Sequence, residues 1–451
     1  MVCKVCKREI DSPVCSFCGE DNTPWINAAK DADPEPEKSN PAPTDDGSSK
    51  PAVRKYKVDY KKLVRLLIAL TVVIVFVVLV VSMFSSDKKK QPKISDTLFT
   101  NDMIAVKSGS EWGYINSENI GGYAIAPQYK YVTDYSDGIA FAYIGNKYAV
   151  INKEGQLLTE PSFEAVGGVS ENGYFAVKTG GKWGYIDKST MGFAIEPKYS
   201  TAGVFTDDIA LVSVNGLYGY IGTDGEYVIA PQYDFALGFS DGYAAIHSGG
   251  KWGYITKNGD AAIEPVYDEA QNFENGLAIV CYFGDYGVIN TDGKFVIEPQ
   301  FDAMASFDVS GNSKIKLGDK FGYVNKKGNY VINPRFSALG DFDGEKLTYA
   351  AGSDGKFGFI NNKGEFVVEP QFEDAGNFYG GLAPVKKDGL WGYADSKGKM
   401  VIEAKYYEAL RFYGDGYAVV SDESGKYQII DKNGTNLLSS GVSVDKVLIA
   451  D

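Results

Sequence analysis

Four cysteines near the N-terminus have the spacing of a metal site. Cys3 and Cys6 form one Cys-x2-Cys pair, and Cys15 and Cys18 form a second. Each pair can present two thiolates from one turn, and two pairs complete the tetrahedral shell that Zn²⁺ prefers. Because protein ligands fill all four positions, the predicted zinc is structural. Two disulfides are the alternative, and they suit a small domain in an oxidising compartment.

The N-terminal segment resembles the short zinc-ribbon found at the start of many bacterial membrane proteins. We assign residues 1–25 to this zinc-ribbon. Residues 26–60 follow, with recurrent proline among Asp, Glu, Ser, Lys and Ala and almost nothing large and apolar. Such a segment cannot bury enough surface to offset the entropy of ordering it. It is therefore predicted to be a disordered linker.

A long apolar stretch predicts a transmembrane helix at residues 61–86. Its apolar span is 66–84, in which only Thr71 and Ser82 are polar. As a helix this span is about 28 Å long, close to the hydrocarbon thickness of a bilayer. A buried core helix is the alternative, but core helices usually keep one polar face. The position in the chain and the lack of a cleavage pattern favour an uncleaved signal-anchor.

The flanking charges predict the orientation of this helix. Six basic residues precede the apolar span from Arg54 to Arg65, and four follow it in the juxtamembrane linker, residues 87–95. The excess favours a cytoplasmic N-terminus and an extracytoplasmic C-terminal part. Zinc-binding thiolates also fit the reducing cytoplasm. The expected location is the cell membrane, with a single span.

From residue 96 to residue 451 an aromatic-glycine pair recurs every 34 to 36 residues. Two weaker copies in the same phase, at Tyr148 and Tyr427, carry Ala149 and Gln428 in place of the glycine. The ten copies predict an array of ten units of about 35 residues. The eight full pairs are Trp112-Gly113, Trp183-Gly184, Tyr218-Gly219, Trp252-Gly253, Tyr286-Gly287, Phe321-Gly322, Phe357-Gly358 and Trp391-Gly392.

Each unit is predicted to be a three-stranded meander followed by a return loop. In the copy at Trp252, glycines mark a hairpin before the pair and a second turn at Gly259 that needs positive φ. Pro265 then marks an edge or the end of a strand, since proline donates no ladder hydrogen bond. Trp252 and Tyr254 share one strand face, which predicts an aromatic ladder between units. Burial of these rings is favoured over sugar stacking, because Trp, Tyr and Phe replace one another freely.

These features together resemble the bacterial WG-repeat family over roughly residues 96–440. The resemblance implies an all-β repeat domain and brings no catalytic residues. Two architectures fit: an open β-solenoid, or a β-propeller closed by a strand from the other terminus. Both ends of the array are in phase, and no borrowed strand is evident. The open solenoid is therefore favoured, with Val447–Ala450 as a cap, and the propeller is the alternative.

Charge and composition limit the function of the array. Beyond residue 93 the chain has 29 basic and 47 acidic residues, a net charge near -18. This acidity argues against nucleic acid as a partner, which requires a basic surface. His247 has no ligand partners at suitable spacing, and Cys281 lies in an apolar strand. We expect His247 to be an ordinary strand residue and Cys281 to be a buried thiol. We expect no enzyme active site in the array.

The sequence thus predicts a single-pass membrane protein with a structural zinc and no other cofactor. Its extracytoplasmic repeat domain is expected to bind a protein or a cell-envelope polymer, because repeat arrays present extended surfaces. The alternative is a transmembrane signalling or assembly adaptor that uses the cytosolic zinc-ribbon. An envelope hydrolase is the third hypothesis.

Overall fold

The computed structural model describes residues 97–342 and 345–448, which form β-strands joined by turns and loops. The predicted zinc ligands Cys3, Cys6, Cys15 and Cys18, the linker segments and the apolar span 66–84 lie outside these residues. In the part of the chain that is described, no helix is both long and apolar enough to cross a membrane.

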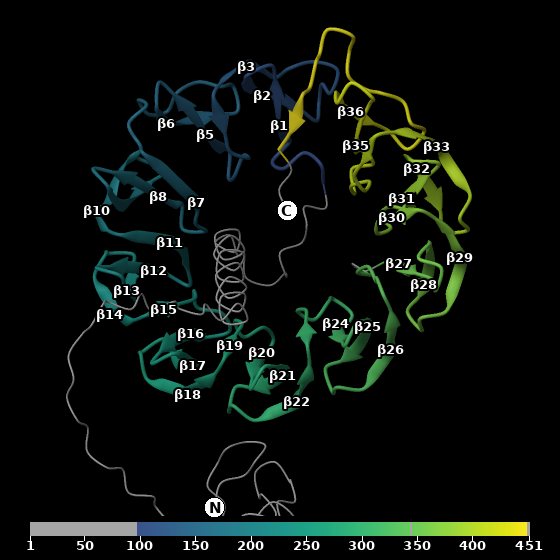
Figure 1. Cartoon of the computed structure of the whole chain (residues 1–451). Helices are drawn as coiled ribbons and strands as arrows, with labels where there is room; N and C mark the ends of the chain where they lie inside the picture. Colours follow the sequence, from purple (N-terminus) through teal and green to yellow (C-terminus); the bar gives the residue numbers. More distant parts are fainter. Residues whose placement is uncertain (1–96, 343–344, 449–451) are drawn as a thin grey trace, which may run out of the picture. The chain divides into compact units, whose positions relative to one another are not determined.

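The strands form ten small antiparallel sheets, which we call blades one to ten in chain order. A complete blade has four strands, named here the inner, second, third and outer strands in their order across the sheet. Figure 1 shows the blades following one another around a ring, with the inner strands toward its centre and the outer strands at its rim. The third strand carries the aromatic-glycine pair.

The strand bounds repeat with the period of the sequence. Inner strands are β37 (Lys446–Val447), β4 (Tyr131–Val132), β7 (Ala165–Val169), β11 (Thr201–Thr206), β15 (Phe235–Ala236), β19 (Glu269–Ala270), β23 (Ala303–Met304), β30 (Asp374–Ala375) and β34 (Glu408–Ala409). Second strands are β1 (Met103–Ser108), β5 (Ile139–Ile144), β8 (Tyr174–Thr179), β12 (Ile209–Val214), β16 (Tyr243–Ser248), β20 (Leu277–Tyr282), β24 (Asn312–Leu317), β27 (Leu347–Ala351), β31 (Leu382–Lys387) and β35 (Ala418–Ser421). Third strands are β2 (Glu111–Asn116), β6 (Lys147–Asn152), β9 (Lys182–Asp187), β13 (Leu217–Gly222), β17 (Lys251–Thr256), β21 (Asp285–Asn290), β25 (Lys320–Asn325), β28 (Phe357–Asn361), β32 (Leu390–Asp395) and β36 (Tyr427–Ile430). Outer strands are β3 (Ile125–Tyr129), β10 (Gly192–Tyr199), β14 (Tyr227–Tyr233), β18 (Ala261–Tyr267), β22 (Phe295–Phe301), β26 (Tyr330–Phe336), β29 (Phe366–Phe372) and β33 (Met400–Tyr406).

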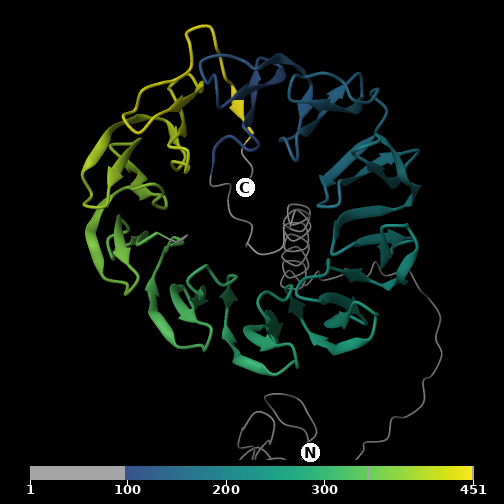
Figure 2. The same ribbon diagram turned by 180° about the vertical axis from the view of Figure 1, so that it is seen from behind.

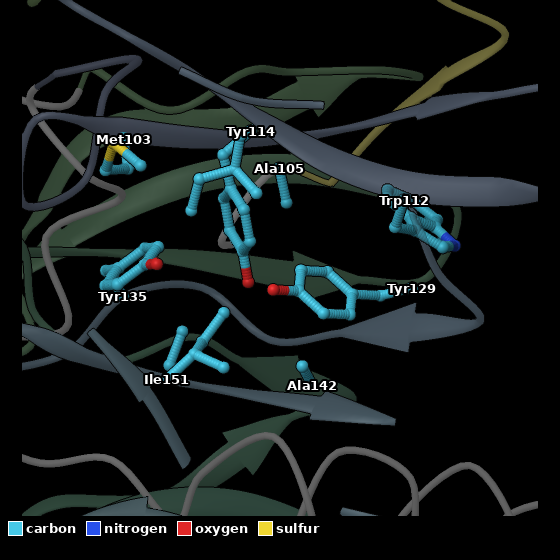
Figure 3. Close-up of a cluster of buried hydrophobic side chains, with 10 residues drawn as sticks. Met103, Ala105, Trp112, Tyr114, Tyr129, Tyr135, Ala142 and Ile151 are labelled. Atoms are coloured by element: carbon cyan, nitrogen blue, oxygen red, sulfur yellow. The ribbon is translucent and has the colours of Figure 1, made fainter. Parts of the chain in front are cut away.

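Both faces of a blade are apolar because each face packs on a neighbouring blade. In β17, Trp252 and Tyr254 share a buried cluster with residues of blade six. Ile255, which points to the opposite face, joins the cluster between blades four and five. The core is therefore divided into one hydrophobic cluster at each boundary between blades, as Figure 3 shows for Tyr114 of blade one and Tyr135 and Ile151 of blade two.

The ring is closed between blade ten and blade one. β37 pairs with β1 through Lys446 opposite Lys107 and Val447 opposite Val106. The backbone N–H of Leu98 donates to the Asp415 carboxylate at 2.8 Å. Figures 1 and 2 show the C-terminal strand lying beside β1 from both sides of the ring. The predicted open solenoid with Val447–Ala450 as a cap is therefore wrong, because Val447 belongs to the strand that closes a propeller-like ring.

The prediction of three strands per unit was also incomplete. After every outer strand except β26, the return segment contains a short inner strand that pairs with the second strand of the next blade, as Glu269 pairs with Cys281. Seven of the ten sheets therefore have four strands. Most inner strands have only two residues, which is too short for a pattern of alternating side chains.

The glycine of the aromatic-glycine pair makes room for the outer strand. A Cβ atom on Gly253 would lie 2.5 Å from the carbonyl oxygen of Ile263 and 2.6 Å from the nitrogen of Pro265. The register of the third and outer strands shifts at this point. The close approach of the strand around Pro265 therefore requires glycine at position 253. The two blades that carry Ala149 or Gln428 instead of glycine have three-stranded sheets without an outer strand.

Candidate binding site

A buried tyrosine connects each regular blade to the next. The residue two positions after the anchor donates its hydroxyl to a backbone carbonyl of the next blade at 2.7 to 2.8 Å. The pairs are Tyr114 with Thr133, Tyr185 with Gly203, Tyr220 with Leu237, Tyr254 with Gln271, Tyr323 with Gly340 and Tyr393 with Leu410. Each ring also contacts an aromatic ring of the next return segment, as Tyr254 contacts Phe273 with centroids 4.6 Å apart. These tyrosines are therefore structural.

The boundary between blades six and seven departs from this arrangement. Val288 stands where the six regular blades have tyrosine, so it cannot donate to the corresponding carbonyl, that of Ala305. This carbonyl instead accepts a hydrogen bond from Ser313 Oγ at 2.5 Å, and Ser313 is fully buried. Met304 takes an inner-strand position that is alanine in blade six, and it contributes to the cluster around Val288. Met304 and Ser313 of blade seven thus compensate in part for the small Val288 side chain of blade six.

A cavity of about 140 Å³ remains at this boundary. It is lined by Glu269, Ala270, Gln271, Ile279 and Tyr286 of blade six and by Ala303 and Met304 of blade seven. A second, smaller cavity of about 40 Å³ shares Gln271 and Ile279 with the first and extends to Asn272, whose buried Oδ1 has no hydrogen-bond partner among the described residues. The boundary between blades six and seven is thus hollowed in two places. We call the larger cavity the six-seven pocket.

The six-seven pocket is acidic. The Glu269 carboxylate accepts a hydrogen bond from the Tyr286 hydroxyl at 2.5 Å, and burial together with this carboxylate raises the pKa of Tyr286. Burial, followed by the charges of Glu269, Asp268 and Asp285, raises the pKa of Cys281 to about 11. Asp268 is paired with Lys251. Among the described residues Glu269 accepts the Tyr286 hydroxyl and has no ion-pair partner.

Other acidic residues of the ring have a structural role that the sequence reasoning missed. A carboxylate just before the inner strand accepts a hydrogen bond from a backbone N–H at the tip of the nearby hairpin. The signal in the sequence was the recurrence of Asp or Glu directly after an aromatic residue, which holds for four of the five pairs, while Asp445 follows Val444. The pairs are Glu164 with Gly181, Asp268 with Gly284, Asp302 with Gly318, Glu373 with Gly389 and Asp445 with Gly109.

The structure places the eight predicted anchor pairs in the third strands of eight different blades, so they do not form one site. Trp112 and Trp252 are buried, and the other anchor rings are half-buried. His247 lies in β16 with its ring 5.4 Å from that of Trp252, and Cys281 is a buried free thiol. Within residues 97–342 and 345–448, no group of three or more His, Cys, Asp or Glu side chains could hold a metal ion.

Ten antiparallel sheets closed by a C-terminal strand define a propeller-like repeat domain. The chain belongs to the family of the WG containing repeat, which matches it nine times between residues 112 and 427. The matched segments are 112–148, 149–183, 183–218, 218–252, 252–282, 286–321, 321–351, 357–391 and 391–427. No curated protein matches the chain in sequence.

Several solved structures are similar to part of the chain. A eukaryotic initiation factor is 12% identical, covers 77% of this chain and 97% of its own, and has a TM-score of 0.46. BamB from Moraxella catarrhalis is 12% identical, with coverage of 68% and 97% and a TM-score of 0.28. Hsv2p from Kluyveromyces lactis is 10% identical, with coverage of 51% and 97% and a TM-score of 0.30.

Proposed function

We propose that this chain is a membrane-anchored binding protein whose WG-repeat ring lies outside the cytoplasm and recognises a protein or a cell-envelope polymer. The apolar span 66–84 and the basic residues around it support the anchor and its orientation. The cysteines Cys3, Cys6, Cys15 and Cys18 support a structural zinc in the cytosolic segment.

One observation carries the binding role. The residues that repeat in blade after blade, such as Tyr254 and Gly253, are engaged in contacts within the ring. The six-seven pocket lies at a boundary where Val288 replaces the tyrosine of the regular blades, and Glu269 in its wall has no basic partner among the described residues. Recognition therefore depends on residues that differ between blades, while the repeated residues maintain the ring.

The orientation is tested by protease treatment of intact cells that express the full-length chain with a tag at each end. We expect loss of the C-terminal tag and of the ring while the N-terminal tag survives. Loss of the N-terminal tag with an intact ring would overturn the proposed orientation. Lysed cells, in which both tags are accessible, are the control for the activity of the protease.

The binding role is tested by placing a photocrosslinking amino acid at Ala303, which is exposed and lines the six-seven pocket. The same residue placed at Val228, which is 44% exposed on an outer strand, is the matched control. After irradiation of intact cells we expect a discrete crosslinked product from position 303 that position 228 does not give. Identical products from both positions, or none from either, would contradict the proposal.

A further inference from the structure

The six-seven pocket has the size of a site for one side chain. Its volume of about 140 Å³ is far above the roughly 10–15 Å³ that holds a single water molecule. Its lining comes from two inner strands, β19 and β23, and from β20 and β21. A group that enters it therefore contacts two blades at once.

The chemistry of the walls selects the kind of group that fits. Ala270, Ile279 and Met304 supply apolar surface, and Glu269 supplies a carboxylate held in place by the Tyr286 hydroxyl. Lysine and arginine side chains complement these walls, because their aliphatic stems pack on apolar surface and their charged heads pair with a carboxylate. The Tyr286 ring offers a further favourable contact for a cation.

The surrounding charges argue against other ligands. Glu269 is the charged residue of the pocket wall, and together with Asp268 and Asp285 it acts on the neighbouring Cys281, so these surroundings disfavour an anion. A neutral apolar group would cover the Glu269 carboxylate without pairing it, which is costly. Of the nearby bases, Lys251 pairs with Asp268, and the Lys316 ammonium lies 5.9 Å from the centre of the Phe321 ring.

We infer that the six-seven pocket receives a lysine or arginine side chain of a protein partner, with Glu269 as its counter-ion. This inference rests on the proposed binding function and names the class of partner, a protein with an exposed basic segment. The apolar walls and the single carboxylate make the pocket a point of attachment, and the acidity of the array attracts basic segments from a distance.

Blade ten offers a matched control for Glu269. Glu408 occupies the same position in its inner strand, β34, and accepts a hydrogen bond from the Tyr427 hydroxyl at 2.6 Å. Replacing either glutamate by glutamine removes one charge and keeps an oxygen that can accept the tyrosine hydroxyl. The two variants therefore have the same net charge, and only Glu269→Gln changes the wall of the six-seven pocket.

The test measures binding of fluorescent hexalysine and hexaarginine peptides to the full-length chain in mild detergent at fixed salt. We expect Glu269→Gln to weaken binding about tenfold, the effect typical of losing one charge-assisted contact, and Glu408→Gln to weaken it less than about twofold. Val288→Tyr, which restores the residue of the regular blades, should also weaken binding by filling the boundary. Hexaglutamate is the negative control.

The outcomes separate the inference from the proposed function. Equal affinities for Glu269→Gln and Glu408→Gln would overturn the pocket assignment, because binding would then follow net charge alone. If position 303 still crosslinks a partner in cells, the binding function would survive that result. Conversely, a selective effect of Glu269→Gln on the peptides without any crosslinked partner would support the chemistry of the pocket and count against the proposed function.

Discussion

The hydroxyl of Tyr254 in blade five donates a hydrogen bond to the carbonyl oxygen of Gln271 in blade six, with a distance of 2.7 Å. The same tyrosine ring packs against Phe273, and Tyr254 is almost fully buried. Burial raises the pKa of this hydroxyl well above its ordinary range, so the group stays a donor at any physiological pH. One side chain thus supplies both a hydrogen bond and a ring contact between blades five and six.

Replacing Tyr254 by phenylalanine should keep the ring contact and remove the hydrogen bond. The Gln271 carbonyl would lose its donor from the neighbouring blade, so we expect the free energy of unfolding to fall by about 1–2 kcal/mol. Urea unfolding of the full-length chain measures the change. Tyr330→Phe is the control, because Tyr330 is 44% exposed on an outer strand. Equal midpoints for the two variants would show that the hydrogen bond does not matter.

Gly253→Ala should destabilise the ring more than its small size suggests. The added Cβ would lie 2.5 Å from a backbone oxygen, so the outer strand must move, at a cost of about 1–3 kcal/mol. Gly238→Ala is the control, since a Cβ at Gly238 has nothing within 4 Å. A comparable thermal midpoint for both variants would refute the account of the glycine given above.

Ring closure is testable with an engineered disulfide. Lys107 and Lys446 are register partners across β1 and β37, and cysteines at such positions lie within the range that a disulfide spans. We expect Lys107→Cys combined with Lys446→Cys to yield an intramolecular crosslink that peptide mapping detects under non-reducing conditions. Lys178→Cys combined with Lys446→Cys should yield none, because Lys178 lies in blade three. Absence of the first crosslink would indicate an open array.

The stability of the ring should depend on pH through Asp134, in the return segment of blade two. Burial raises the pKa of this carboxyl from 3.8 to about 6. Between about pH 4 and pH 6 the folded chain keeps a proton that the unfolded chain has lost. The stability that this proton contributes is therefore complete below about pH 4 and is lost as the pH rises through about 6.

Asp134→Asn carries no charge at any pH, so it should be more stable than the parent chain at pH 7.5. The difference should shrink as the pH falls toward 4, and unfolding midpoints measured at several pH values test this. Asp319→Asn, at an exposed hairpin, is the control for the loss of one negative charge. A difference that is constant with pH would show that Asp134 does not titrate in this range.

Local features of the fold were predictable from the sequence. The turn glycine Gly259 has φ of +85°, as its place seven residues after the anchor predicts. Pro265 lies in an outer strand, and Trp252 and Tyr254 share one face. Each of these features depends on a short stretch of chain with a strong periodic or conformational signal.

Ring closure could not be predicted in the same way. β37 has only two residues, and its partner β1 lies more than 300 residues earlier in the chain. A strand this short has no side-chain periodicity, and its pairing depends on the shape of the whole array. The six-seven pocket is an intermediate case. The sequence shows Val288 in place of tyrosine, but the space left there depends on Met304 and Ser313 of the next blade.

The closing strand also has a consequence for the order of synthesis. β37 follows every other strand of the ring in the chain, yet it supplies the inner strand of blade one. On the ribosome, blade one must therefore wait with an unpaired β1 edge until the entire array has been translated. Premature termination anywhere in the repeats would leave the earliest blade unfinished, so the cell would receive an aggregation-prone fragment instead of a smaller working ring.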